Sequence, residues 1–262
     1  MLQLFKYFNI FLDRFTNHFD TFIMLYIRLL VQKGENHMQI FDILGPVMIG
    51  PSSSHTAGVV RIGNVARRIL GHRPSRAIIN FHGSLAKTYR GHGSDKAIVA
   101  GLLNYKPDDM RIRDSLQHAK EKGFSYQIKT VELESAHPNT VVLELFCDKT
   151  RDFTLQGASV GGGNILIQKI DGIDVAFDGY HDTLIVRHKD EPGAISAVTS
   201  IFTVERINIA GMKVYRENRM RQGGDAIMVI EVDEKLNKEL AATISGLTAI
   251  DQVTILRGAS HD

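Results

Sequence analysis

The side chains best suited to chemistry in this sequence gather at residues 50–58, which read Gly-Pro-Ser-Ser-Ser-His-Thr-Ala-Gly. An apolar, periodic stretch follows at residues 59–66, so the run predicts a helix entrance whose hydroxyls accept hydrogen bonds from unpaired amides. A helix N-terminus suits a carboxylate or a phosphate, and His55 beside it is able to move a proton. An ordinary Ser/Thr cap with an exposed histidine has the same pattern, and both interpretations stay open on the residues alone.

The composition narrows the classes of protein. A chain of 262 residues with 44% hydrophobic content is long enough for two domains. Its net charge of +2 gives no reason to expect a nucleic acid or a membrane surface as partner. Cys147 is the only cysteine, which excludes an internal disulfide framework and a multi-thiolate metal site made by this chain alone. This fits a cytoplasmic protein, and Cys147 itself follows a strand-like run that favours a packed thiol.

The first 37 residues look foreign to the rest of the chain. The apolar run at residues 21–31 is too short for a membrane span and contains Arg28, and no cleavable signal peptide is evident. Residues 33–37 can be encoded by a purine-rich stretch that resembles a ribosome-binding region ahead of Met38. We therefore predict that residues 1–37 form an extension that is either non-native or disordered, with translation naturally starting at Met38.

The next segment, residues 38–180, is predicted to be a mixed domain of helices and strands. Helices are expected at residues 59–70 and 96–103, and strands at residues 77–82, 124–133, 140–146, 151–156 and 165–170. The glycine-containing stretch at residues 83–96 is expected to be a loop able to approach a ligand, and residues 171–180 a strand tail and linker. The three glycines at 161–163 indicate either a close backbone approach or a flexible turn between strands.

The last segment, residues 181–262, has a different periodicity. Its expected elements are strands at residues 183–188, 207–215, 225–232 and 252–256, and helices at residues 194–204 and 236–247. That order, βαββαβ, is the ferredoxin-like arrangement. It gives an antiparallel sheet with helices on one face and an exposed edge strand that favours pairing with a second copy. The fold class predicted for the whole chain is therefore α+β, in two domains.

This last segment resembles an ACT domain, a small module that binds amino acids. The resemblance depends on the turn at residues 190–193, the helix after it, and the strand opening at residues 207–209. It implies an effector site at Asp190, Gly193 and Asn208, located between two copies. A domain used only for dimerisation is equally compatible, because a fold does not determine a function.

The first domain resembles the β subunit of the two-chain, iron-sulfur-dependent L-serine dehydratases. Six segments carry the resemblance: residues 41–46, 49–58, 61–63, 83–97 and 137–140, and the glycines 161–163. It implies a serine dehydratase β-type substrate-binding domain followed by the ACT domain. It also implies L-serine ammonia-lyase activity, in which L-serine loses water and gives pyruvate and ammonia.

The resemblance further implies a [4Fe-4S] cluster that acts as a Lewis acid on the serine hydroxyl. Such clusters need several thiolates, so the cluster is expected on the α subunit, and this chain alone is expected to be inactive. The implied partners are the α subunit, L-serine and a second ACT domain.

The residues matched by the resemblance receive expected roles. The expected substrate-binding residues, placed to hold the serine carboxylate, are Ser52, Ser53, Ser54 and Thr56. The expected catalytic residues are His55, Lys87 and His92. Without the resemblance, Lys87 and His92 would be assigned to a solvated loop. The general base is not identifiable from the sequence and could belong to the partner.

Other classes of function are possible alternatives to a serine dehydratase. A pyridoxal-phosphate dehydratase needs a Schiff-base lysine and a phosphate cup on a larger fold. The chain contains neither the Gly-x-Ser-x-Gly elbow of serine hydrolases nor a phosphate-binding loop. The main alternative is a non-catalytic amino-acid sensor, since the first domain also resembles a substrate-binding domain of some phosphoglycerate dehydrogenases.

Overall fold

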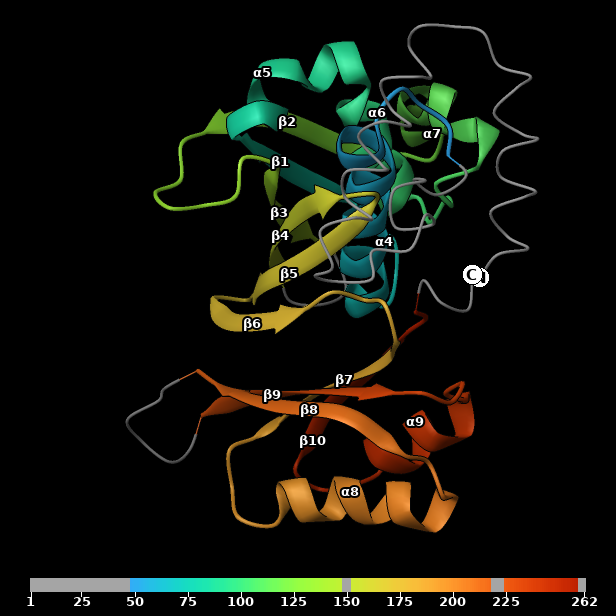
Figure 1. Ribbon diagram of the computed structural model, residues 1–262, viewed down its shortest axis with the longest axis vertical. Coiled ribbons are helices and arrows are strands. Elements are labelled where there is room, and N and C mark those ends of the chain that lie inside the picture. Colours follow the sequence, from blue (N-terminus) through green and yellow to red (C-terminus); the bar gives the residue numbers. More distant parts are fainter. Residues whose placement is uncertain (1–47, 148–151, 218–223, 259–262) are drawn as a thin grey trace, which may run out of the picture. The chain divides into compact units, whose positions relative to one another are not determined.

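The computed structural model describes residues 48–147, 152–217 and 224–258, all within a compact unit that spans residues 44–262 (Figure 1). The predicted extension at residues 1–37 lies outside the described residues. The mixed α+β class predicted from the sequence is confirmed. The boundary expected at residues 180–181 falls between the last strand of one sheet and the first strand of the next.

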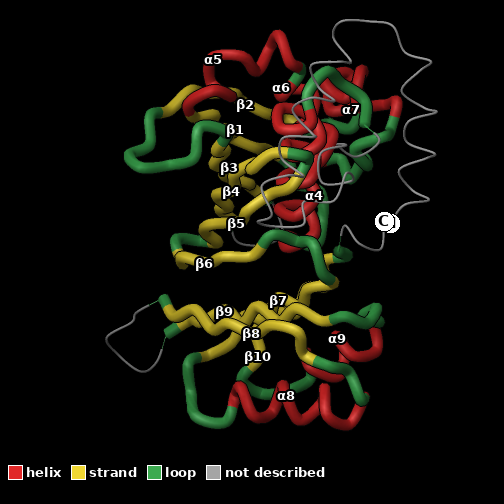
Figure 2. Tube along the Cα trace, viewed as in Figure 1, coloured by secondary structure: helices red, strands yellow, loops and turns green. Residues whose placement is uncertain are grey.

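The first sheet has six strands in the order β2-β1-β3-β4-β5-β6 (Figure 2). Its strands are β1 (Arg76–His82), β2 (Ser125–Val131), β3 (Thr140–Phe146), β4 (Phe153–Gly161), β5 (Asn164–Ile170) and β6 (Ile173–Phe177). Strands β1 and β2 are parallel, and the pairs β1–β3, β3–β4, β4–β5 and β5–β6 are antiparallel. The expected strand tail at residues 171–180 is therefore a sixth, paired strand. The glycines at 161–163 form the β4–β5 hairpin turn, and all three have positive φ.

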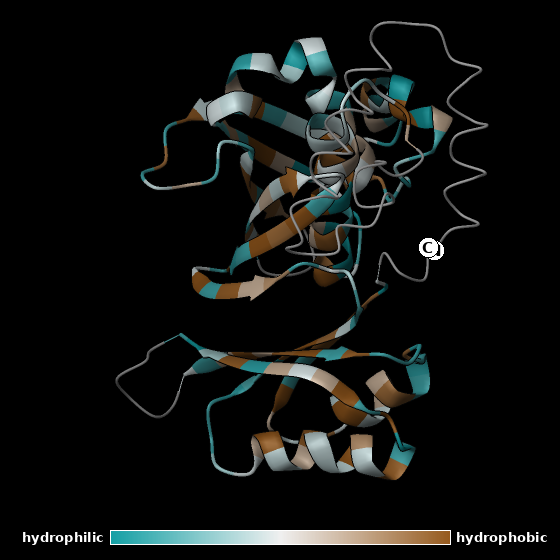
Figure 3. Cartoon of the chain, in the orientation of Figure 1, coloured by the Kyte–Doolittle hydropathy of each residue, from teal (hydrophilic) through white to brown (hydrophobic). Residues whose placement is uncertain are grey.

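The helices of this part come from between the strands. They are a π-helical turn η1 (Ser53–Ala57), α4 (Gly58–Leu70), α5 (Gly83–His92), α6 (Ser94–Leu102), a 3₁₀ turn η2 (Met110–Asp114) and α7 (Ser115–Glu121). Helix α4 buries Val59, Ile62 and Ile69 at the helical spacing that the sequence predicted, and it ends at Gly71 in the left-handed conformation. Figure 3 shows hydrophobic residues along the strands that these helices accompany.

Helices α4 and α6 cross with their backbones unusually close. A Cβ on Gly63 would lie 3.0 Å from the Gly101 Cα and 2.8 Å from the Ile98 carbonyl oxygen, and a Cβ on Gly101 would meet the Val60 carbonyl oxygen. Neither position has room for a larger residue. This contact places the beginning of α6 against the turn that precedes α4.

The prediction of a loop at residues 83–96 is wrong, because most of this segment is helix α5. Gly83 and Gly93 do have positive φ, +59° and +71°, but they sit at the two ends of the helix. Between them lie Leu85, Ala86 and other residues with good helix propensity. The glycines therefore set the boundaries of α5, and Gly91 is accommodated inside it.

The second sheet has four strands in the order β10-β7-β9-β8, all of whose pairs are antiparallel. Its elements are β7 (Asp182–Lys189), α8 (Ala194–Glu205), β8 (Ile209–Arg216), β9 (Asp225–Val232), α9 (Lys238–Ser245) and β10 (Ile250–Leu256). The predicted βαββαβ order is confirmed. Part of the expected polar hairpin, residues 218–223, lies outside the described residues.

Side-chain contacts join elements of the two sheets, and one of them lies between the Tyr215 hydroxyl on β8 and the Ala176 backbone on β6. The Gln252 side-chain amide donates to the Ile69 carbonyl oxygen at the end of α4, at 2.6 Å. Arg187 on β7 pairs with Asp171 in the β5–β6 turn at 2.6 Å, and both side chains are largely buried.

Across residues 48–147, 152–217 and 224–258, no helix is long and apolar enough to cross a membrane.

Candidate active site

The serine-rich run forms a π-helical turn that leads directly into α4. Ser52 precedes the turn in an extended conformation, and its Oγ accepts a hydrogen bond from the His55 amide at 3.2 Å. The Gly58 amide donates to the Ser53 carbonyl oxygen, which closes the wide turn. Single π-helical turns occur often at functional sites, because the extra residue redirects the side chains within it.

The His55 ring is held on both sides by hydroxyl groups. Its Nδ1 lies 3.2 Å from the Ser52 Oγ and 3.1 Å from the Ser54 Oγ. Its Nε2 lies 3.1 Å from the Oγ of Ser84, in the first turn of α5. Each hydroxyl is able to donate or accept, so this arrangement suits either tautomer of the neutral ring and supports a proton moving on or off it.

A second imidazole stands next to the first. The ring centroids of His55 and His92 are 4.8 Å apart, with the planes tilted by 50°. The His92 Nδ1 is buried and has no hydrogen-bond partner among the described residues. Burial lowers the pKa of His55 below its ordinary value of 6.5, and repulsion from His92 lowers it further. His55 is therefore neutral at pH 7 and available as a proton acceptor.

Three helices begin at this cluster. The turn containing His55 opens α4, Ser84 lies in the first turn of α5, and Ser94 opens α6 and donates its hydroxyl to the His55 carbonyl oxygen at 2.8 Å. Helix N-termini carry partial positive charge, so their convergence favours an anion such as a carboxylate.

Residues 137–139 position the start of α5. The Ser84 amide donates to the Pro138 carbonyl oxygen at 2.7 Å, and a Cβ on Gly83 would lie 2.6 Å from that same oxygen. Gly83 is therefore required both by its positive φ and by this close approach. This contact fixes the position of Ser84 relative to the His55 ring.

The structure brings together most of the predicted catalytic and substrate-binding residues. Ser52, Ser54, His55 and His92 lie in one cluster, as described above. Thr56 is buried and donates its hydroxyl to the His92 carbonyl oxygen at 3.3 Å, so it joins the two histidine segments. No side-chain contact of Ser53 is among those described.

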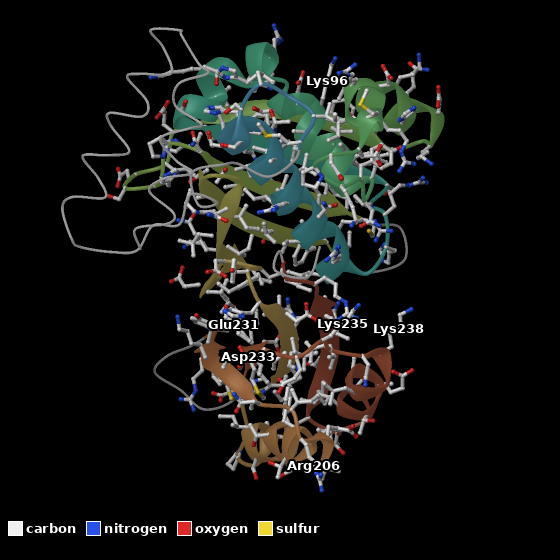
Figure 4. The ribbon with its side chains drawn as sticks, turned by 45° about the vertical axis from the view of Figure 1, so that its right-hand side comes forward. Lys96, Arg206, Glu231, Asp233, Lys235 and Lys238 are labelled. Carbon is white, nitrogen blue, oxygen red and sulfur yellow. The ribbon has the colours of Figure 1, made fainter. Side chains whose placement is uncertain are left out.

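Lys87 differs from the other predicted catalytic residues. It lies on α5 but its side chain is exposed, and no contact with either histidine is described. Lys96, further along on α6, is also exposed (Figure 4). Ser84, by contrast, contacts His55 and was not predicted as a site residue. A glycine immediately before a serine, at a break after a strand, was the available signal for it.

The predicted effector residues do not meet within one chain. Asp190 follows β7 and pairs with Arg216 at 3.1 Å, at the end of the sheet where Lys189 lies opposite Asp225. Asn208 lies at the other end, where its side-chain amide donates to Asp233 at 3.5 Å. Gly193, with φ of +95°, precedes α8. An effector site containing all three residues would need two copies of the chain.

Cys147 lies away from this cluster, after β3. Its Sγ is 3.4 Å from the His72 Nδ1. The described residues contain no group of three His, Cys, Asp or Glu side chains arranged to hold a metal ion. A chain with one cysteine lacks the thiolates of an iron-sulfur cluster, so its own residues do not fit that group.

Comparison with known proteins agrees with this architecture. The family described as serine dehydratase beta chain matches residues 39–169, and the ACT domain family matches residues 183–248. The chain belongs to the serine dehydratase beta chain family and carries a C-terminal ACT domain. The resemblance stated from the sequence is confirmed.

Two relatives align over most of their length. The probable L-serine dehydratase beta chain of Bacillus subtilis is 41% identical over 83% of this chain and 97% of its own length. The L-serine dehydratase beta chain of Peptoniphilus asaccharolyticus is 36% identical over 79% of this chain and 92% of its own length. D-3-phosphoglycerate dehydrogenase of Bacillus subtilis is 25% identical over 75% of this chain, but only 37% of that protein is covered. The stronger matches do not favour a purely regulatory sensor.

Proposed function

We propose that this chain is the β subunit of an L-serine ammonia-lyase that converts L-serine to pyruvate and ammonia together with an α subunit. The observation that carries the proposal is the position of the His55 ring, held between hydroxyls where three helices begin. The names of the two nearly full-length relatives support the substrate and the presence of a second subunit.

The substrate carboxylate is proposed to bind at the entrance of α4, against Ser52, Ser53, Ser54 and nearby backbone amides. Positive ends of helices and hydroxyl donors suit a carboxylate. Thr56 acts through its contact with the His92 segment. Lys87, being exposed, is assigned to the approach of the substrate or to the surface that meets the partner.

The reaction breaks the Cα–H bond and the Cβ–O bond of serine, and water leaves. The resulting aminoacrylate tautomerises to an imine, which water hydrolyses to pyruvate and ammonia. We assign to His55 the exchange of a proton with the substrate through Nε2, next to Ser84, because its lowered pKa keeps the ring neutral at pH 7. His92 helps to keep it neutral.

The [4Fe-4S] cluster implied by the family is assigned to the α subunit, since this chain offers one thiol. We further propose that the ACT domains of two chains associate, with the edge strand β8 as a candidate surface. Such a pair would join Asp190 and Gly193 of one copy to Asn208 of the other in an effector site. A cytoplasmic location is proposed on the single cysteine.

The decisive experiment is pyruvate formation from L-serine, measured without oxygen, by this chain with and without the co-expressed α subunit. We expect activity only in the pair, and loss of that activity in air. An inactive pair with an intact cluster, combined with serine binding by this chain alone, would instead establish an amino-acid sensor. A His55→Gln variant in the pair, with cluster absorbance as loading control, tests whether this chain contributes to turnover.

A further inference from the structure

A pocket far along α4 from the histidine cluster is lined by two arginines, Arg67 and Arg68. It has a volume of about 470 Å³ and lies between the end of α4 and strand β10. Its lining is Arg67, Arg68, Gly71, Asn104 and residues 252–255. This volume falls within the range of pockets that bind small molecules.

The charges in this pocket all have the same sign. Arg67 and Arg68 are half-buried, and neither makes an ion pair with a described residue. The lining contains no carboxylate. Burial lowers the pKa of Arg67, and repulsion from the nearby Arg73 lowers it further, although a guanidinium stays charged in proteins. Arginines in a last helical turn offset the helix dipole, but that role does not require a pocket around them.

Neutral polar groups complete the lining. Thr254 is only 8% exposed and lines the pocket. Asn104 is exposed, has positive φ of +65°, and also lines the pocket. Gln252, in the same wall, already holds the Ile69 carbonyl oxygen through its NH₂ group. The lining therefore combines a hydroxyl and a side-chain amide with two guanidinium groups, and all of these groups are able to donate hydrogen bonds to an anion.

We propose that this pocket binds a small organic anion that carries a phosphate or carboxylate group, clamped by Arg67 and Arg68. Guanidinium groups recognise both headgroups through paired N–H donors. The remaining volume accommodates a short polar tail against Asn104 and Thr254. The bound anion would contact α4 and β10 together, next to the hydrogen bond that already joins them.

The test is isothermal titration calorimetry on the full chain at constant ionic strength, with glycerol 3-phosphate and citrate as probes. We expect saturable one-site binding of at least one probe, and the tighter probe identifies the headgroup. Replacing both arginines, Arg67→Gln with Arg68→Gln, is expected to weaken binding about tenfold or more, because two charge-assisted hydrogen bonds are lost. Arg113→Gln, an exposed arginine on η2, is the matched control and should bind as the unchanged chain does.

A second pair of variants covers the case in which the double glutamine chain does not fold. Arg67→Lys with Arg68→Lys keeps both charges but removes the paired donors, so binding should fall between those of the other two chains. Absence of saturable binding for both probes, or equal affinity in all folded variants, would overturn the proposal. Equal affinity would place the bound anion elsewhere, such as at the helix N-termini around His55.

Discussion

At the scale of single residues, the site depends on which nitrogen of His55 carries the proton. Hydroxyls reach both nitrogens, from Ser52 and Ser54 on one side and from Ser84 on the other. The first two are neighbours in sequence and were predicted. Ser84 arrives from another helix, and it alone reaches Nε2 among the contacts described.

Removing the Ser84 hydroxyl should therefore impair turnover more than substrate binding. We expect Ser84→Ala, assayed in the pair with the α subunit, to lower kcat about tenfold or more with a smaller change in KM, since proton transfer by a positioned group typically contributes 10²–10⁴-fold. Steady-state pyruvate formation measures this, and ¹⁵N NMR of His55 should show a changed tautomer ratio. Ser200→Ala, on the exposed face of α8, is the control. Unchanged kcat and an unchanged tautomer would remove Ser84 from the site.

The second prediction concerns pH. Burial and then His92 lower the pKa of His55, so a rate that needs the neutral ring should have its acid limb below pH 6.5. His92→Gln removes the repulsion, so the His55 pKa should rise toward 6.5. NMR titration of the His55 ring measures it directly, with His118→Gln as control.

The same shift affects stability. The folded chain holds His55 neutral, so the unfolded chain binds more protons once the pH falls below 6.5, and stability decreases from there down to the folded pKa. His92→Gln should narrow this pH window. A His55 pKa that does not move in that variant would show that burial alone causes the shift.

The sequence predicted those contacts of the site that join residues close together along the chain. Ser52, Ser54 and His55 are within one turn of each other, so their proximity was readable from the chain. The pairing of His55 with Ser84 spans 29 positions and depends on where α5 starts. Lys87 was expected at the site because of the family resemblance, and residues 83–96 were interpreted as a loop that could bring it close to a ligand. In a helix, its direction is fixed relative to Ser84, and it points to solvent.

At the scale of elements, the crossing of α4 and α6 holds the two halves of the site together. The crossing depends on Gly63 and Gly101, whose positions leave no space for a Cβ. The sequence predicted both helices, but a glycine within a helix also indicates a less stable helix. The packing role of Gly63 and Gly101 is visible only from the contact between the two helices.

Adding one methyl group should therefore have opposite effects at two helical glycines. Gly101→Ala is expected to destabilise the chain by about 1–3 kcal/mol, because its Cβ meets the Val60 carbonyl oxygen and overpacking separates the helices. Gly91→Ala, inside α5 with nothing within 4 Å, is the matched control and should stabilise by about 0.5–1 kcal/mol. Urea unfolding followed by circular dichroism measures both. Equal effects would contradict the close crossing.

The strands and helices of the domain that contains the second sheet were predicted more completely than those of the first domain. A βαββαβ unit builds its sheet from regularly spaced alternating segments, so local periodicity is enough. Among the elements of the first domain, helices α5 and α7 were missed, and β6 was predicted only as a strand tail. Strand β6 has only five residues, and its pairing with β5 rather than its composition defines it.

At the scale of the whole molecule, one buried carboxylate connects three segments around the second sheet. Asp182 is fully buried and accepts hydrogen bonds from the Leu236 and Gly258 amides and from Arg257. Burial alone would raise the pKa of Asp182, but these donors outweigh it and hold the pKa below its ordinary value of 3.8. The beginning of β7, the approach to α9 and the segment after β10 thus share one anchor.

Asp182→Asn should destabilise the chain by about 2 kcal/mol or more, since Arg257 loses a charged partner and one amide donor faces an NH₂ group. The folded pKa is depressed, so the stabilisation from Asp182 is present above pH 3.8 and is lost as the pH falls through the folded value. The variant should therefore lose less stability than the unchanged chain on acidification. Asp233→Asn, at an exposed carboxylate, should stay within about 0.5 kcal/mol in the same urea titrations.

The π-helical turn at Ser53–Ala57 also constrains how chains of this family can change length. Such a turn contains one residue more than an α-helical turn. Deleting that residue would rotate the serines by about 100° relative to the apolar face of α4, because each α-helical residue turns by that angle. Either the core contact of α4 or the alignment of His55 with Ser84 would then be lost. Insertions and deletions should therefore be absent from this segment in functional relatives, even where its individual residues differ.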